Sequence, residues 1–207
     1  EEDAYFANKH GYSKHSPAMP LYTEQDAKYC IQQFHVEKLN TWFQPIQGWN
    51  AKFSSAGHIL GAASLLLEVG ERRILFSGDL GRPDDSLMNP PDAPPQADTV
   101  LIESTYGNRA HPLENVNAEL GEALKRVAGR GGVAVVPVFA VGRAQAVLHS
   151  IAQLKASGEI PHGLPIFLDS PMAIHTTALF KRHMGEHRLN GAEVQAMDGV
   201  ATMICLL

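Results

Sequence analysis

Ser55-Ala-Gly-His-Ile-Leu-Gly-Ala-Ala-Ser64 places one histidine between two glycines, just ahead of an apolar segment. Two later stretches carry acids at comparable places, namely Phe76-Ser-Gly-Asp-Leu-Gly-Arg82 and Ile102-Glu-Ser-Thr-Tyr-Gly107. Residues 64–69 and 72–77 are typical of β-strands, and the Gly70-Glu71 step between them predicts a hairpin. That hairpin would bring His58 and Asp79 to one edge of a sheet. Because imidazole and carboxylate groups both bind zinc or manganese, the pair predicts a divalent-metal site.

These stretches resemble motifs of the metallo-β-lactamase fold and, within it, of the β-CASP nucleases. Gly57-His58-Ile-Leu-Gly61-Ala62 is similar to the third metal motif of that fold, and Ser77-Gly78-Asp79 to the fourth. Glu103-Ser-Thr-Tyr-Gly107 resembles the acidic motif that opens the β-CASP segment. The likeness extends over nearly the whole chain, through Pro137-Val-Phe-Ala-Val-Gly-Arg143-Ala-Gln and Leu168-Asp-Ser-Pro171-Met-Ala.

The resemblance implies an α/β fold in two parts. Residues 1–107 would form a partial metallo-β-lactamase domain, an αββα sandwich without its first metal motif. Residues 108–207 would form a truncated, Rossmann-like β-CASP cap domain. The sequence pattern of this second part alternates helices and strands, which favours a parallel sheet covered by helices. Its predicted elements are a helix from Leu113 to Val127 opened by His111-Pro112, a buried strand at Val133 to Val138, a helix at Ala144 to Leu154, a strand at Leu164 to Leu168, and a helix capped by Ser170.

The same resemblance implies a zinc-dependent hydrolase that cleaves RNA phosphodiester bonds with two zinc ions in the complete site. In that site Asp79 would bridge both ions and His58 would ligate one of them. Glu103 closes an apolar strand, where an acid needs a partner. In the family the matching acid hydrogen-bonds a later histidine near the scissile phosphate, so Glu103 is the candidate catalytic residue.

Two helix starts are candidates for substrate binding. Ser170 and Arg143 each lie where free N–H groups at a helix N-terminus attract anions such as phosphate. The alternatives are that Ser170 only caps its helix and that Arg143 has a packing or ion-pair role.

The metal motif that supplies most of the ligands is not found in this sequence. The pattern His-x-His-x-Asp-His does not occur among the ten histidines of the chain. It is expected upstream of Glu1, and two further histidine motifs are expected beyond Leu207. We therefore expect the 207-residue chain alone to be inactive as a nuclease.

The composition is that of a folded protein and leaves the function open. The chain has 44% hydrophobic residues and a formal net charge of −5. An acidic balance does not point to nucleic acid, whose partners usually present a basic face. However, carboxylates that hold metals make a site acidic, and the bound cations restore a positive field for phosphate.

The two cysteines, Cys30 and Cys205, lie far apart without Cys-x-x-Cys spacing. They argue against a disulfide framework and favour the cytoplasm, with both expected to be buried as small hydrophobic residues. The chain lacks a run of about 18 apolar residues, so a membrane is not an expected partner. Single-stranded RNA is the expected partner, and a homodimer is left open.

The N-terminal residues predict helices and strands ahead of the first motif. Residues 2–9 predict a helix that ends at Gly11. Thr23, with Asp26 three residues later, predicts the start of a helix running to Phe34 that buries one face against the sheet. Residues 40–53 predict two short strands around a turn. Elsewhere, residues 83–98 predict an exposed loop, and residues 185–207 alternate polar and apolar residues without a clear ending.

Three other interpretations stay open. A β-CASP scaffold subunit with eroded metal ligands would also carry these motifs, although the three found here are intact. A small-molecule metallo-hydrolase on the same fold is less consistent with residues 108–207, because an α/β segment in that place is a nucleic-acid-processing trait of the resemblance. DNA could replace RNA as the substrate. The sequence upstream of Glu1 would separate an enzyme from a scaffold.

Overall fold

The computed structural model describes residues 1–110 and 115–204 and shows a mixed α/β protein. It comprises two compact units, Glu1–Lys38 and Leu39–Leu207. His111 and Pro112, which were predicted to open a helix, and Cys205 lie outside the described residues. The helix predicted after them is present as α3, Val116–Gly129. None of the helices in the described ranges combines the length and apolar character needed to cross a membrane.

The first unit contains two helices, of which α1 ends and α2 begins where the sequence predicts a cap. Helix α1 spans Glu2–His10 and ends at Gly11, whose φ is 68°. Helix α2 spans Glu24–Ile31, and at its start the Thr23 hydroxyl accepts a hydrogen bond from the Asp26 amide at 3.2 Å. The Asp26 carboxylate in turn accepts from the Thr23 amide at 2.8 Å. This reciprocal pair is the capping box that the sequence indicates.

Two expectations for α2 are wrong. The helix ends at Ile31 rather than Phe34, and none of its residues is buried, Cys30 included. Ala7 is the one buried residue of the two helices, and large apolar side chains of the first unit such as Tyr5, Phe6 and Phe34 are exposed. A unit this short exposes most of its surface, because little of it can be enclosed.

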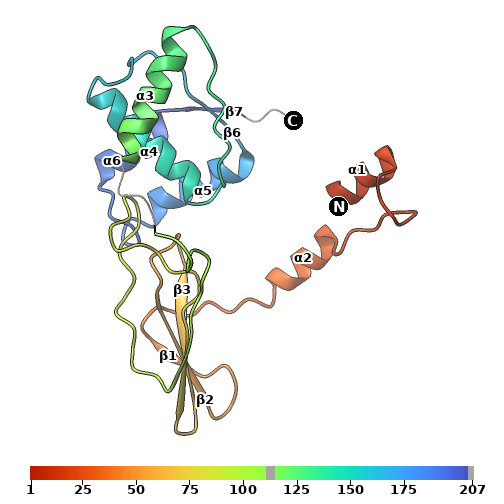
Figure 1. The fold of residues 1–207 in the computed structure, drawn as a ribbon. Coiled ribbons are helices and arrows are strands. Elements are labelled where there is room, and N and C mark those ends of the chain that lie inside the picture. Colours follow the sequence, from red (N-terminus) through yellow and green to blue (C-terminus); the bar gives the residue numbers. More distant parts are fainter. Residues whose placement is uncertain (111–114, 205–207) are drawn as a thin grey trace. The chain divides into compact units, whose positions relative to one another are not determined.

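A five-stranded sheet opens the second unit (Figure 1). The order is β1-β2-β3-β4-β5, antiparallel from β1 to β4, with β5 parallel to β4. The hairpin between β3 and β4 pairs Val69 with Arg72 and turns at Gly70, whose φ is 60°, as predicted. The strands span Trp42–Phe43, Trp49–Ser55, Ala63–Val69, Arg72–Phe76 and Thr99–Leu101.

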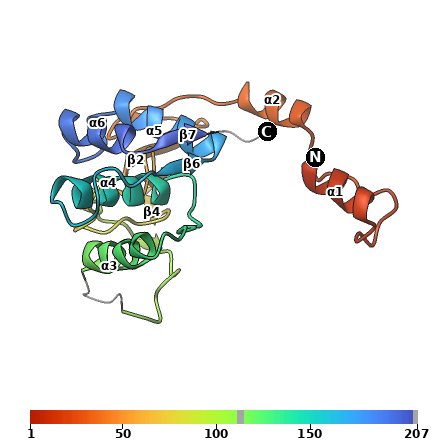
Figure 2. The same cartoon turned by 90° about the horizontal axis from the view of Figure 1, so that it is seen from above.

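The remainder of the second unit consists of four helices and a two-stranded parallel sheet. Helix α4 contacts α3, α5 and α6, and Figure 2 shows it between α3 and the other two. The parallel pairing of β6 with β7 is the part of the predicted parallel sheet that is present. The elements are α3 Val116–Gly129, α4 Arg143–Ala156, β6 Phe167–Asp169, α5 Pro171–Arg182, α6 Gly191–Gly199 and β7 Thr202–Ile204.

The buried strand predicted at residues 133–138 does not form. This segment is irregular and exposed, with Val133 at 87% and Val135 at 86% of full exposure. In the described part of the chain no strand pairs with this segment. The nearby strands β6 and β7 form a sheet of their own. A run of valines favours a strand, but a strand needs a hydrogen-bonded neighbour.

The segment after residue 185, described from the sequence as an alternation of polar and apolar residues, contains helix α6. Asn190 caps this helix by accepting from the Glu193 amide at 3.0 Å, and Glu193 accepts from the Asn190 amide at 2.8 Å. The Asn-x-x-Glu spacing is a readable start signal. Without a strong apolar stripe behind it, however, that signal did not lead to a predicted helix.

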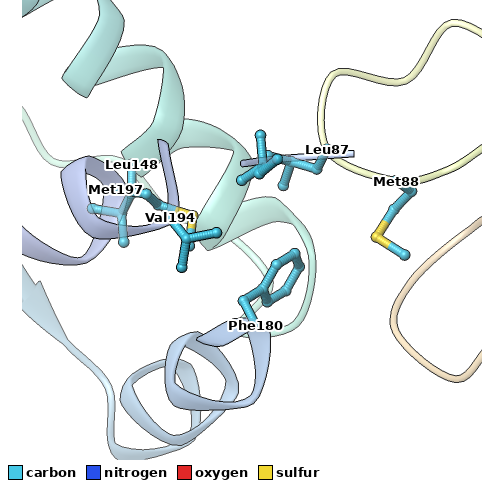
Figure 3. Close-up of a cluster of buried hydrophobic side chains, with 7 residues drawn as sticks. Leu87, Met88, Leu148, Phe180, Val194 and Met197 are labelled. Atoms are coloured by element: carbon cyan, nitrogen blue, oxygen red, sulfur yellow. The ribbon is translucent and has the colours of Figure 1, made fainter. Parts of the chain in front are cut away.

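The loop at residues 83–98 is not fully exposed as predicted, because Leu87 and Met88 are buried. Both belong to a cluster with helix residues, and Figure 3 shows them facing Phe180, Val194 and Met197. Arg188 fastens the loop by donating from its amide to the Leu87 carbonyl at 2.8 Å and from Nε to the Met88 carbonyl at 2.8 Å. This loop is therefore where the five-stranded sheet is joined to the helices.

Helix α4 buries an imidazole, that of His149, which is 5% exposed. The Gln153 side chain lies 3.0 Å from His149 Nε2, and its oxygen accepts from Asn117 at 2.9 Å. The Gln153 amide nitrogen therefore donates to His149, whose Nε2 must be unprotonated. Burial lowers the pKa of His149, and the charge of Glu193 opposes this only in part.

We expect the protein to become less stable as the pH is lowered, because of His149. Its contribution is full above the ordinary histidine pKa of about 6.5 and declines as the pH falls from there towards the lower folded-state pKa. The reason is that the unfolded chain takes up a proton that the folded chain resists. Urea unfolding at a series of pH values should show this loss, and His149→Gln should reduce it. His175→Gln, an exposed position on α5, is the control; an identical pH profile in all three proteins would contradict the prediction.

Candidate functional site

Three loops meet at one edge of the five-stranded sheet. They comprise residues 56–62 between β2 and β3, residues 77–82 after β4, and residues 102–107 after β5. Ser55 pairs with Ala63, Leu65 with Phe76, and Phe76 with Leu101, so all three loops leave the sheet on the same side. We refer to this place as the loop junction. It holds the predicted site residues His58, Asp79 and Glu103.

The loops of His58 and Asp79 touch along their backbones. The Gly81 amide donates to the Ala56 carbonyl at 2.8 Å. A Cβ atom on Gly81 would fall on the Gly57 carbonyl and lie 2.7 Å from the His58 nitrogen. A Cβ on Gly57 would lie 2.6 Å from the Asn89 carbonyl oxygen. Only glycine fits at position 81 against the His58 loop, and only glycine fits at position 57 against the segment of Asn89.

Glu103 is half-buried, and its carboxylate faces the other two loops. It accepts a hydrogen bond from the Thr105 amide at 2.8 Å. Hydrogen bonds from the backbone and side chain of Thr105 lower the pKa of Glu103, against a smaller effect of desolvation. The Leu80 backbone and the charge of His58 lower this pKa further. Because Leu80 is next to Asp79, the Glu103 carboxylate lies where all three loops meet.

The junction offers two donor groups of the kind that zinc accepts, but two alone do not fit a complete site. The side chains of His58 and Asp79 are exposed, and neither hydrogen-bonds to another described residue. Zinc takes three or four protein ligands. Across residues 1–110 and 115–204, no group of three or more His, Cys, Asp or Glu side chains is placed to hold a metal ion.

The start of helix α4 lies beside the His58 loop. A Cβ atom on Gly142, the residue before Arg143, would lie 3.0 Å from the side chain of Ile59. Arg143 is exposed and its guanidinium makes no ion pair with the described residues. The fully buried Gln145 holds this helix start, since it accepts from the Gly142 amide at 2.8 Å and donates to Thr177 at 3.1 Å. The guanidinium of Arg143, the predicted phosphate-binding residue, therefore has no ion-pair partner among the described residues. The backbone at this helix start is held in place by Gln145.

Ser170 is the N-cap of α5, with Pro171 following as predicted. Its hydroxyl oxygen accepts from the Ala173 amide at 3.2 Å. This is the capping role that the sequence left as the alternative, and one lone pair of the hydroxyl is committed to it. No contact places Ser170 at the loop junction.

The His58 loop is also held from the helical side, by residues that the sequence did not single out. Glu186 accepts from the Gly61 amide at 3.2 Å with one carboxylate oxygen and faces His183 at 3.3 Å with the other. Leu60 packs against the cluster around Phe180. Gln145 had a readable signal, a polar residue on the apolar face of α4, whereas Glu186 had none.

Chemically, the loop junction brings together an imidazole, two carboxylates and the start of a helix with a free arginine. Exposed His58 and Asp79 can bind a cation, and Arg143 can bind an anion. Glu103 is ionised at neutral pH, and the hydrogen bonds that lower its pKa favour the carboxylate form, which can accept a hydrogen bond or stabilise a protonated partner. This combination suits an anionic substrate that reacts beside a metal ion.

Comparison with known proteins finds similarity to RNA-processing proteins. Residues 144–204 match the Beta-Casp domain family. The chain is 33% identical to Ribonuclease TTHA0252 of Thermus thermophilus, over 86% of the chain and 40% of that protein. It is 33% identical to an RNase J-like protein of Methanocaldococcus jannaschii, over 82% of the chain and 43% of that protein. It is 30% identical to cleavage and polyadenylation specificity factor 73 of Drosophila melanogaster, over 79% of the chain and 24% of that protein. The chain therefore spans less than half the length of each of these relatives.

We expect Gly81→Ala to disrupt the loop junction. The added methyl group meets backbone atoms of Gly57 and His58, which cannot rotate away as a side chain can. Overpacking of this kind costs about 1–3 kcal/mol of unfolding free energy. The measurement is urea unfolding with the backbone amide signals of residues 56–62 followed by NMR. Gly163→Ala, where a Cβ meets nothing within 4 Å, is the matched control. Equal stability and unchanged loop signals in both variants would contradict the contact.

Proposed function

Because the chain belongs to the β-CASP family, we propose that it forms part of a metal-dependent hydrolase that cleaves phosphodiester bonds of RNA. Two of the relatives are named as ribonucleases and a third as a cleavage factor, which supports RNA as the substrate class. The observation that carries the proposal is the loop junction, where the Gly81 to Ala56 hydrogen bond joins the loops of His58 and Asp79 beside Glu103.

In this proposal His58 and Asp79 contribute to a site for two zinc ions. Asp79 and His58 would be among the residues that hold these ions. Further donors have to come from outside the described residues, since the two present leave the site incomplete. Bound zinc would supply positive charge for the phosphate and a water of lowered pKa.

Glu103 serves as a proton acceptor or as an anchor for a protonated partner. The hydrogen bonds from Thr105 that lower its pKa stabilise the carboxylate, so Glu103 is unsuited to donate a proton at neutral pH. Arg143 binds a phosphate of the substrate from the start of α4, beside the His58 loop. The Ser170 hydroxyl already accepts the capping hydrogen bond from Ala173. It contributes to substrate binding only through its proton and its second lone pair.

The proposed fold places these residues in two domains. Residues 1–107 correspond to part of a metallo-β-lactamase αββα sandwich, to which the sheet β1–β5 would belong. Residues 108–207 correspond to part of a β-CASP cap that closes over the RNA strand. The burial of Leu87 and Met88 among the helices supports a cap fixed to the sheet.

We expect Asp79→Asn, made in the complete polypeptide that contains this chain, to lose at least one zinc ion and nearly all RNA cleavage. The amide keeps the shape of the side chain but lacks the negative charge that holds two cations together. Zinc stoichiometry by mass spectrometry, cleavage of single-stranded RNA, and circular dichroism as the folding control are the measurements. Asp84→Asn, an exposed position in the following loop, is the matched control. A variant with two zinc ions and normal cleavage would remove Asp79 from the site, and an inactive unsubstituted protein would favour the scaffold alternative.

We expect Glu103→Gln to lower turnover by about 10²-fold or more while the metal content is retained. The reason is that the amide cannot accept a proton, although it can still accept the Thr105 hydrogen bond. RNA cleavage beside metal analysis separates the outcomes. Glu71→Gln, in the exposed β3–β4 turn, controls for the loss of one negative charge. Loss of zinc from Glu103→Gln would make Glu103 a metal ligand, and unchanged turnover would leave it with a structural role.

A further inference from the structure

Ser77 uses every polar group it has at the loop junction. It is 6% exposed and lies directly after β4, two residues before Asp79. Its amide donates to the Leu101 carbonyl at 2.9 Å, and its carbonyl accepts from the Ser64 hydroxyl at 2.7 Å. Its own hydroxyl donates to the Gly78 carbonyl at 2.7 Å and accepts from the Glu103 amide at 2.9 Å.

The hydroxyl of Ser77 therefore connects the two loops that carry the acids. Its proton is directed to the Gly78 carbonyl, in the peptide link that precedes Asp79. Its oxygen accepts a hydrogen bond from the backbone amide of Glu103. A single oxygen atom thus sets the backbone of one acid relative to the backbone of the other.

The surroundings leave this arrangement little freedom. Gly78 has a φ of 59°, and a Cβ there would lie 2.7 Å from the Ala63 carbonyl oxygen, so its peptide cannot shift towards β3. The Ser64 hydroxyl holds Ser77 from the β3 side. Towards Glu103, the contact of this segment is made by the Ser77 hydroxyl itself.

We propose that Ser77 is a positioning residue that fixes Glu103 relative to Asp79 for the reaction. The inference rests on the proposed function, because positioning matters only if both acids act on one substrate. Ser77 itself touches neither metal nor substrate. Loss of its hydroxyl would leave a buried Glu103 amide without its acceptor and let the two loops move apart. Misplacement by about 1 Å can cost about 10²-fold in rate.

The test compares substitutions in the complete polypeptide that contains this chain. We expect Ser77→Ala to lower kcat on single-stranded RNA by about 10- to 10²-fold, with KM and zinc content unchanged. Ser77→Thr, which keeps the hydroxyl, should recover most of the lost kcat. Ser64→Ala is the matched control, because it removes a buried hydroxyl bonded to the same residue but leaves the link between the two loops in place.

Each outcome decides the question. Normal kcat in Ser77→Ala overturns the inference, as does an equal loss in Ser64→Ala, which would indicate general destabilisation. Should Ser77→Ala fail to fold, Ser77→Cys replaces it, since a thiol is a weaker donor and acceptor and should show the same loss of kcat. An unsubstituted protein without RNA cleavage overturns the proposed function together with this inference, whereas a normally active Ser77→Ala overturns the inference alone.

Discussion

The close approach of two backbones, at Gly57 and Gly81, is the constraint on which the candidate site depends. The Gly81 amide can donate to the Ala56 carbonyl because Gly81 carries no side chain, since a Cβ atom there would overlap the Gly57 carbonyl. A larger residue at position 81 would push the loops of His58 and Asp79 apart. The sheet brings the three loops to one edge, but this contact brings two of them within reach of a common ligand.

A second connection holds the sheet and the helices together around that site. The segment from His183 to Leu189 bonds to the Gly61 amide through Glu186 and to the loop of Leu87 and Met88 through Arg188. The buried side chains of that loop then join the cluster around Phe180. The position of the His58 loop is consequently linked to the packing of α5 and α6. A change in helix packing would therefore be transmitted to a predicted site residue along a short chain of contacts.

The sequence predicted the local features well because their causes are local. Gly70 turns a hairpin, Thr23 caps a helix and Ser170 caps another, and each of these is decided within a few residues. The features that it did not predict depend on partners far along the chain. The role of Ser77 requires Glu103 to arrive from a parallel strand, and the burial of Leu87 requires helices that begin only at Arg143, Pro171 and Gly191. The valine-rich strand failed for the same reason, since periodicity indicates a preference and cannot supply the neighbouring strand.

Residues 133–138, exposed and apolar, have a consequence for the handling of the protein. In the described part of the chain their backbone groups make no hydrogen bonds within the molecule, so their amides and carbonyls are available to other chains. Such a segment is a template for β-pairing between molecules. Pairing of this kind increases with protein concentration and does not require the protein to unfold. Pro137 interrupts it, because a proline offers no N–H and ends a growing ladder. Pro137 is therefore the residue within this segment that limits pairing with other chains.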